Sequence, residues 1–100
     1  MSSSYKSKFR KLVKRANNIG LCVKLVPDKE TYDYVGMNPE AAKMLDFPCP
    51  RNTIMIDNNM TWRDKCYTLN HEIIEYELMS NKNCTYGDAH RAALKLERKI

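Results

Sequence analysis

The sequence predicts one α+β domain: an N-terminal helix, a small antiparallel three-stranded sheet, a long helix that carries His71 and Glu72, and a closing C-terminal helix. Three observations lead to this fold class. Apolar residues recur at helical spacing near both ends of the chain. Three short runs between residues 21 and 57 contain β-branched or aromatic side chains and are bounded by turn residues. The length of 100 residues, with 43% hydrophobic composition, supports a single modest core, so residues 1–100 form one domain.

The first helix is predicted over residues 5–18, because apolar residues recur there at helical spacing, namely Phe9, Leu12, Val13, Ala16 and Ile19. A pair of asparagines and then Gly20 end it. The four residues that precede the helix are polar or terminal, and we expect them to be mobile.

Basic residues are concentrated on this first helix. Residues 1–27 contain seven Lys or Arg and no acidic residue, a charge of +7, whereas residues 28–100 contain ten basic and twelve acidic residues, a charge of −2. The formal net charge of +5 therefore originates near the N-terminus. Such an arm can bind nucleic acid or another anionic surface, and a solvated helix face is the alternative. The candidate nucleic-acid-binding residues are Lys6, Lys8, Arg10, Lys11, Lys14 and Arg15.

The sheet is predicted from three strands, over residues 21–26, 31–37 and 53–57. The first two flank the turn sequence Pro-Asp-Lys-Glu at residues 27–30, which predicts an antiparallel hairpin. Two closely spaced prolines predict an irregular loop over residues 46–50, before the third strand.

Three further helices are predicted from the capping signals at their starts. The first begins with asparagine followed by proline, and the other two begin with threonine followed three residues later by aspartate. These helices are predicted over residues 41–45 after Asn38, 62–79 after Thr61, and 86–98 after Thr85.

Both histidines lie on the last two predicted helices. His71 begins the run His-Glu-Ile-Ile-Glu, and residues four apart share a helix face, so its imidazole and the Glu75 carboxylate can converge. This is the layout of the helical H-E-x-x-H motif, with glutamate at the second ligand position. A short connection between two antiparallel helices can bring His90 back over His71. Two imidazoles and one carboxylate are a ligand set typical of catalytic zinc.

Other residues near this set have roles that the same chemistry predicts. Glu72 projects beside the metal position and is the predicted general base. Tyr86 is the predicted hydrogen-bond donor to a developing oxyanion, with Tyr76 as the alternative. The candidates for holding the imidazole N–H groups are Asp64, Thr68 and Glu97.

The order of helix, antiparallel strands, His-Glu helix and closing helix resembles the minimal zincin architecture, in particular the short gluzincin-like metallopeptidase domains. The resemblance covers most of the chain as architecture and residues 71–75 as motif. It implies a zinc-dependent peptidase or peptidase-like protein, with His71 as first ligand, Glu72 as base and strand 53–57 as an edge for docking an extended peptide. Gluzincins have histidine at the second ligand position and glutamate on the closing helix, so Glu75 and His90 stand here in reversed order.

Ordinary structural roles remain open for the same residues. His90 can pair with Glu97 or Asp88 of its own helix, and the glutamates at positions 72, 75 and 77 can form a solvated acidic face. The function classes are therefore a small zinc-dependent hydrolase acting on a peptide or protein, a non-catalytic nucleic-acid-binding or regulatory protein, and an interaction protein whose first helix packs on a partner. The sequence contains no helix-turn-helix, zinc-finger or RNA-binding signature.

The four cysteines contain no C-x-x-C pair, which argues against a four-cysteine zinc site. Free thiols are expected in a reducing compartment, and one or two disulfides are the alternative for Cys22, Cys49, Cys66 and Cys84. No apolar run approaches the roughly 20 residues of a membrane span, and no apolar segment of a secretory signal is present. We therefore expect an intracellular, cytoplasmic protein.

Overall fold

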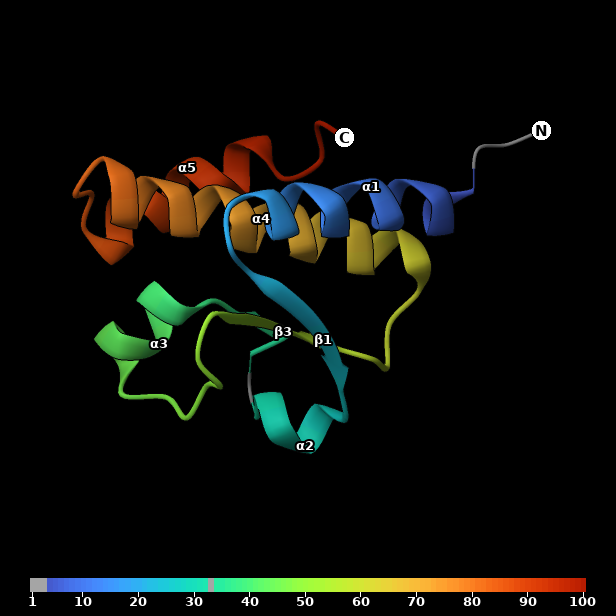
Figure 1. The fold of residues 1–100 in the computed structure, drawn as a ribbon, viewed down its shortest axis with the longest axis horizontal. Coiled ribbons are helices and arrows are strands. Elements are labelled where there is room, and N and C mark those ends of the chain that lie inside the picture. Colours follow the sequence, from blue (N-terminus) through green and yellow to red (C-terminus); the bar gives the residue numbers. More distant parts are fainter. Residues whose placement is uncertain (1–3, 33) are drawn as a thin grey trace.

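The computed structural model describes residues 4–32 and 34–100 of the chain. Helices α1, α4 and α5 form a layer on one side of a small sheet, and α2 lies on the other side (Figure 1). The predicted α+β class, with an N-terminal helix and a closing C-terminal helix, is confirmed. In chain order the elements are α1 (Tyr5–Asn18), β1 (Cys22–Val26), α2 (Asp28–Thr31), β2 (Gly36–Met37), α3 (Pro39–Leu45), β3 (Thr53–Asp57), α4 (Trp62–Asn81) and α5 (Tyr86–Leu96).

The helices begin at the predicted capping residues. The hydroxyl of Thr61 accepts a hydrogen bond from the Asp64 amide, and the hydroxyl of Thr85 does the same for Asp88, so both long helices start with a satisfied N–H group. Ser4 caps α1 in the same way, whereas residues 1–3, also expected to be mobile, lie outside the described residues. The predicted ends of α4 and α5 are within two residues of those observed.

The sheet is mixed, so the predicted antiparallel hairpin is wrong. Strand β1 pairs in parallel with β3, and β2 pairs antiparallel with the other edge of β3, giving the order β1-β3-β2. Most of the predicted turn at residues 27–30 instead forms α2, because Pro27 precedes two acidic residues that suit the first turn of a helix. The strand predicted over 31–37, which includes the undescribed residue 33, is thereby reduced to Gly36–Met37.

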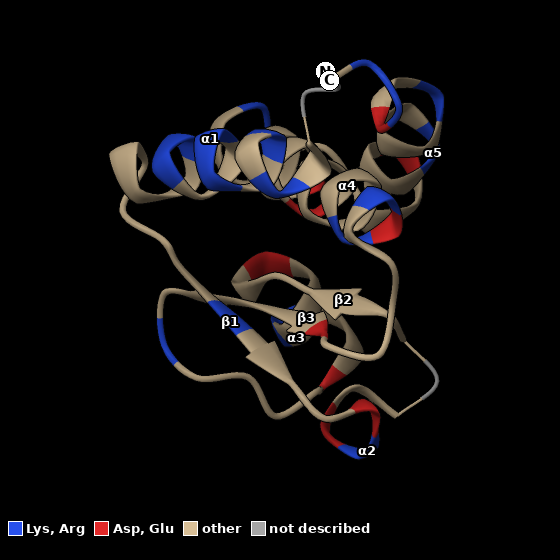
Figure 2. Cartoon of the chain, turned by 90° about the vertical axis from the view of Figure 1, so that its right-hand side faces the viewer, with Lys and Arg blue, Asp and Glu red and all other residues tan. Residues whose placement is uncertain are grey.

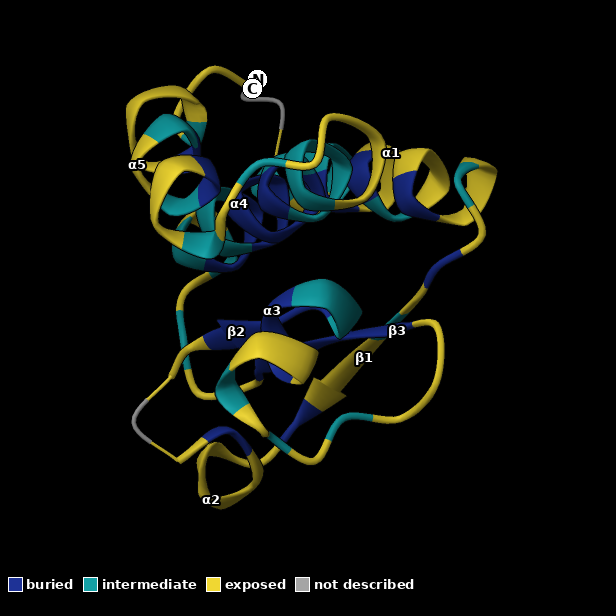
Figure 3. Cartoon of the chain, turned by 90° about the vertical axis from the view of Figure 1, so that its left-hand side faces the viewer, coloured by how far each residue is buried: buried dark blue, intermediate teal, exposed yellow. Residues whose placement is uncertain are grey.

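The main core lies between the helical layer and the sheet. Ile54 and Ile56 of the central strand β3 are fully buried against α1 and α4, whereas Met55 on the opposite face lies on the side of α2. Figure 3 shows buried residues gathered on α4, β2 and β3, with most of α2 and the outward faces of α1 and α5 exposed. The helical side chains of this core are Phe9, Leu12 and Ala16 of α1 and Cys66, Leu69 and Ile73 of α4.

All four cysteines are free thiols, which agrees with the first expectation and not with the alternative of one or two disulfides. Cys66 is fully buried, and its Sγ donates a hydrogen bond to the carbonyl of Tyr5. Among the described residues, no helix is long and apolar enough to cross a membrane.

Strand β2 can lie directly against α4 because residue 36 is glycine. A Cβ atom at Gly36 would lie 2.7 Å from Cγ2 of Thr68 and 3.1 Å from Cγ of Glu72. Gly36→Ala should therefore lower the free energy of unfolding, measured by urea denaturation, by about 1–3 kcal/mol. Adding Thr68→Ser, which removes the clashing methyl group, should recover part of this loss.

The matched control is Gly87→Ala, because a Cβ atom at Gly87 would meet only Nη1 of Arg91, at 3.8 Å. This helical substitution should raise the free energy of unfolding by about 0.5–1 kcal/mol. If Gly36→Ala were as stable as the unsubstituted protein, the close contact between β2 and α4 would be contradicted.

Candidate metal centre

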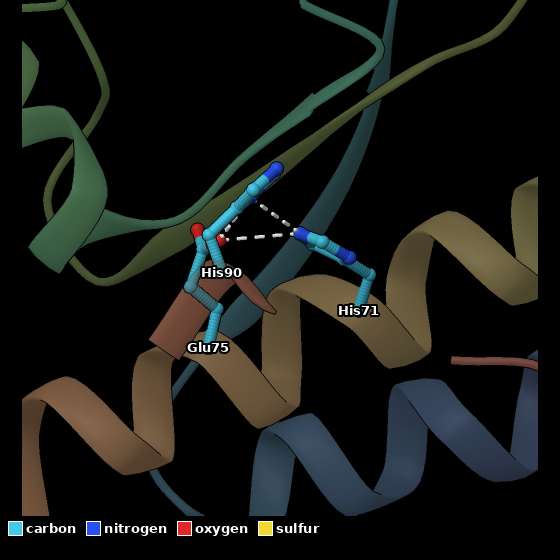
Figure 4. A group of neighbouring side chains, drawn as sticks. All are labelled: His71, Glu75 and His90. Atoms are coloured by element: carbon cyan, nitrogen blue, oxygen red, sulfur yellow. Dashed lines mark hydrogen bonds and ion pairs between the residues drawn. The ribbon is translucent and has the colours of Figure 1, made fainter. Parts of the chain in front are cut away.

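The structure brings together His71, Glu75 and His90, as the spacing predicts (Figure 4). Oε2 of Glu75 lies 3.1 Å from Nε2 of His71 and 2.8 Å from Nδ1 of His90. The two imidazole nitrogens are 3.2 Å apart. Two nitrogens and one carboxylate oxygen therefore form a compact triangle, and we call these three residues the triad.

The packing of α4 against α5 explains this convergence. His71 and Glu75 are one turn apart on α4, and a short loop returns the chain so that α5 lies along α4. Ala89 and Ala93 of α5 are fully buried, and their small side chains allow the two helices to approach closely. His90, on the turn between these alanines, is thereby held over His71.

Carboxylates surround His71 at both ring nitrogens. Its Nδ1 lies 2.8 Å from Oε1 of Glu97, while Nε2 faces Glu75. Burial alone would lower the pKa of His71, but hydrogen bonds to Glu75 and Glu97 and the charge of Glu72 outweigh it and raise the pKa to about 9. Burial likewise acts to raise the pKa of Glu75, yet hydrogen bonds with both histidines leave it below its ordinary value.

Glu72 lies beside the triad and is almost completely buried. Burial first, and then the charge of Glu75, raise the pKa of Glu72 to about 8. The amide of Asn38 connects the two carboxylates, because its Nδ2 donates to Oε1 of Glu72 at 2.9 Å and to Oε1 of Glu75 at 3.0 Å. The other atom of this amide, Oδ1, caps α3. Asn38 therefore fixes α3, Glu72 and Glu75 relative to one another.

The triad lies at the wall of a pocket of about 340 Å³ between β2, α4 and α5. Tyr86 lines this pocket and stacks on His90, with ring centroids 5.5 Å apart. Burial and the nearby carboxylates raise the pKa of Tyr86 to about 12, so its hydroxyl keeps its proton. No Lys or Arg is among the described residues that line the pocket. Three exposed apolar side chains belong to the lining: Tyr34, Val35 and Leu94.

The residues predicted to hold the imidazole N–H groups have different positions in the structure. Glu97 does contact an imidazole nitrogen, but that of His71 on α4 and not that of His90 on its own helix. Thr68 contacts Met60 and Asp64 pairs with Arg63 at the surface, so those two predictions are wrong. The alternative in which His90 pairs with Glu97 or Asp88 of its own helix is also wrong, because Glu97 contacts His71 and Asp88 pairs with Arg91. The alternative of a solvated acidic face fails because Glu72 and Glu75 are buried.

Two residues of the site were missed by sequence reasoning. Asn38 was interpreted as a helix cap only, although the same side chain also binds two carboxylates. Gly36 carried no signal by itself, since its role depends on a contact with α4 that is distant in sequence.

The triad could hold a metal ion, because its three ligand atoms all lie within 4.8 Å of one another. Their separations of 2.8, 3.1 and 3.2 Å are hydrogen-bond distances, slightly shorter than the roughly 3.3 Å between neighbouring ligand atoms of a tetrahedral site with bonds of about 2.0–2.1 Å. Glu97 on the second nitrogen of His71 matches the carboxylate that usually orients a metal-binding imidazole. Imidazole and carboxylate are donors that zinc accepts. His90, with 40% of its side chain exposed, leaves the position open to solvent.

Without metal, the protein should become less stable as the pH rises from about 6 to about 9. Folding raises the pKa of His71 from 6.5 to about 9. The stabilisation that protonated His71 gives the fold is therefore complete below pH 6.5 and is lost as the pH rises through 9. Folding also raises the pKa of Glu72, from 4.5 to about 8, because the buried carboxyl resists ionisation. This shift likewise lowers the free energy of unfolding as the pH rises. Urea unfolding in the presence of a chelator measures this change.

The Glu72→Gln variant should show a smaller decline over the same interval, because the amide does not ionise. A free energy of unfolding that increases with pH would contradict the assigned electrostatics of both groups.

Comparisons with known proteins give no relative for this chain: no protein-family model, curated protein or solved structure matches it significantly.

Proposed function

We propose that this chain is a small zinc-dependent hydrolase of zincin-like design that cleaves internal amide bonds in extended peptides. The observation that carries the proposal is the triad, whose three ligand atoms lie 2.8–3.2 Å from one another at the wall of a pocket. A zinc ion held there supplies Lewis-acid chemistry, which acidifies water and polarises a carbonyl oxygen.

The residues around the triad supply the other functions of a hydrolase. In its carboxylate form Glu72 accepts the proton of the attacking water, and it then delivers this proton to the leaving amine. Its raised pKa of about 8 suits the delivery step. Tyr86 keeps its proton and donates a hydrogen bond to the developing oxyanion. Glu97 orients His71, and Asn38 keeps the two glutamates in place.

The pocket favours an uncharged, internal segment of a peptide. It contains glutamates and apolar side chains but no described cation that would bind a terminal carboxylate or a phosphate. The exposed side chains of Tyr34, Val35 and Leu94 suit apolar substrate residues. The substrate is therefore a peptide or protein segment with apolar side chains beside the cleaved bond.

The strand that docks this segment is β2, which corrects the sequence-based expectation for 53–57. Strand β3 lies in the centre of the sheet and has no free edge. The Val35 carbonyl accepts a hydrogen bond from the Asp57 amide, so the antiparallel alternation directs the N–H and C=O of Gly36 to the outer edge. Gly36 is buried but lines the pocket, so an extended peptide in the pocket can pair with these groups beside Glu72.

Free thiols on all four cysteines are in keeping with a reducing compartment, and we place the activity in the cytoplasm.

The test uses purified protein with one equivalent of zinc and a mixture of peptides whose two termini are blocked. Mass spectrometry should reveal internal cleavage next to apolar residues, abolished by a chelator and restored by zinc. Cleavage no greater than that of the Glu72→Gln variant would overturn the proposal.

A further inference from the structure

A second surface of the molecule combines cations and tyrosines from three separate segments. Nζ of Lys8 lies 5.0 Å from the ring centroid of Tyr5, and Cζ of Arg98 lies 5.4 Å from that of Tyr67. The two tyrosine rings contact each other edge to face, with centroids 6.3 Å apart. The N-terminal turn of α1, the first half of α4 and the C-terminal segment therefore meet in one row of Lys, Tyr, Tyr and Arg.

The row continues along α1. Lys11 lies one turn beyond Lys8, is exposed, and forms no ion pair with any residue that the structure describes. Figure 2 shows Lys and Arg along α1 and at the C-terminal end of the chain, and α1 contains no acidic residue. We call Tyr5, Lys8, Lys11, Tyr67 and Arg98 the basic surface. Arg15 does not belong to it, since it is paired with Glu77.

The cations of this surface are partly ordered before any partner binds. Both cation–ring distances lie within the roughly 6 Å over which a tyrosine ring attracts a cation. Holding the long side chains of Lys8 and Arg98 in position reduces the conformational entropy that binding would otherwise cost. The surface is thus arranged to receive closely spaced negative charges.

The chemistry favours a nucleic acid over a membrane. An interfacial helix must insert an apolar face into lipid, but Phe9, Leu12 and Ala16 of α1 are buried in the core. Partly exposed tyrosines placed between cations suit a single strand, whose phosphates meet the cations and whose bases contact the rings. None of the residues of the basic surface lines the pocket of the triad.

We propose that the basic surface binds single-stranded nucleic acid without sequence preference, mainly through its phosphates. This inference is independent of the proposed hydrolase activity, because the two sites share no residue.

The experiment measures fluorescence anisotropy of labelled 20-nucleotide single strands of DNA and RNA, and of the matching duplex, over a range of salt concentrations. The test variant carries Lys8→Gln, Lys11→Gln and Arg98→Gln. The control carries Lys29→Gln, Lys43→Gln and Arg51→Gln, which removes the same charge from α2, α3 and the loop before β3. Both are compared with the unsubstituted protein and with His90→Ala.

The test variant should bind about 10–100-fold more weakly at low salt, and the slope of log K against log salt should become less steep by roughly 2. The control and His90→Ala should bind like the unsubstituted protein. Equal weakening in the control, tighter binding to the duplex, or no binding at low salt would overturn the proposal. So would tight binding to phosphatidylserine vesicles that single strands fail to displace.

Discussion

His90→Ala should lower the affinity for zinc by a factor of roughly 100 or more, since even outer partners of a metal ligand contribute 10–100-fold. The substitution removes one of three ligand atoms, while 40% of the His90 side chain is exposed, so the fold should tolerate it. His71→Ala is a less clear test, because it leaves Glu75 and Glu97 without their partner. Competition with a chromogenic chelator measures the affinity.

Two further variants test whether a loss of zinc affinity is specific to the triad and its partners. Glu97→Gln leaves the triad complete but weakens the contact with Nδ1 of His71, so the affinity should fall by about 10–100-fold. Arg91→Ala changes an exposed neighbour of His90 and should leave the affinity unchanged. If the native protein and His90→Ala bound zinc equally well, His90 would not be a zinc ligand.

Glu72→Gln should separate zinc binding from hydrolysis. The rate of peptide cleavage should fall by about 10²–10⁴-fold because the proton acceptor is lost, while the zinc content stays at one per chain. The variant should also be at least as stable as the native protein near neutral pH, since a buried carboxyl beside Glu75 is replaced by a neutral group of the same shape.

The matched control for this experiment is Glu77→Gln, which removes a carboxylate from the same helix. Glu77 pairs with Arg15 and does not line the pocket, so hydrolysis should continue at the native rate. If Glu72→Gln lost its zinc, or if both variants cleaved equally well, Glu72 would not be the base.

The surroundings of Glu75 suit a carboxylate at this position of the proposed site. Its Oε2 contacts both imidazoles, while its Oε1 accepts from the amide of Asn38. A carboxylate at this position therefore has a hydrogen-bond partner for the oxygen that does not face the triad.

The helices and the triad could be predicted because their signals are local. Threonine caps fix where α4 and α5 begin, and the four-residue interval between His71 and Glu75 defines a common helix face. The short connection between the helices then leaves few places for His90. Prediction succeeded where the interacting residues lie on one helix or on two helices joined by a short loop.

The sheet could not be predicted in the same way. The parallel pairing of β1 with β3 joins segments separated by α2, β2 and α3, and no local signal distinguishes it from a hairpin. The roles of Gly36 and Asn38 depend on contacts with α4 more than thirty residues away. Locally, Gly36 is only a small residue and Asn38 is only a helix cap, so neither residue predicts a contact with α4.

X-ray absorption at the zinc edge of the metal-loaded protein tests whether His71, Glu75 and His90 hold zinc. We expect nitrogen and oxygen neighbours only, at about 2.0–2.1 Å, with an imidazole signature for two ligands that is reduced in His90→Ala. A sulfur neighbour at about 2.3 Å would place the metal on the free cysteines instead. That result, or a protein that retains no zinc, would contradict zinc binding by the triad.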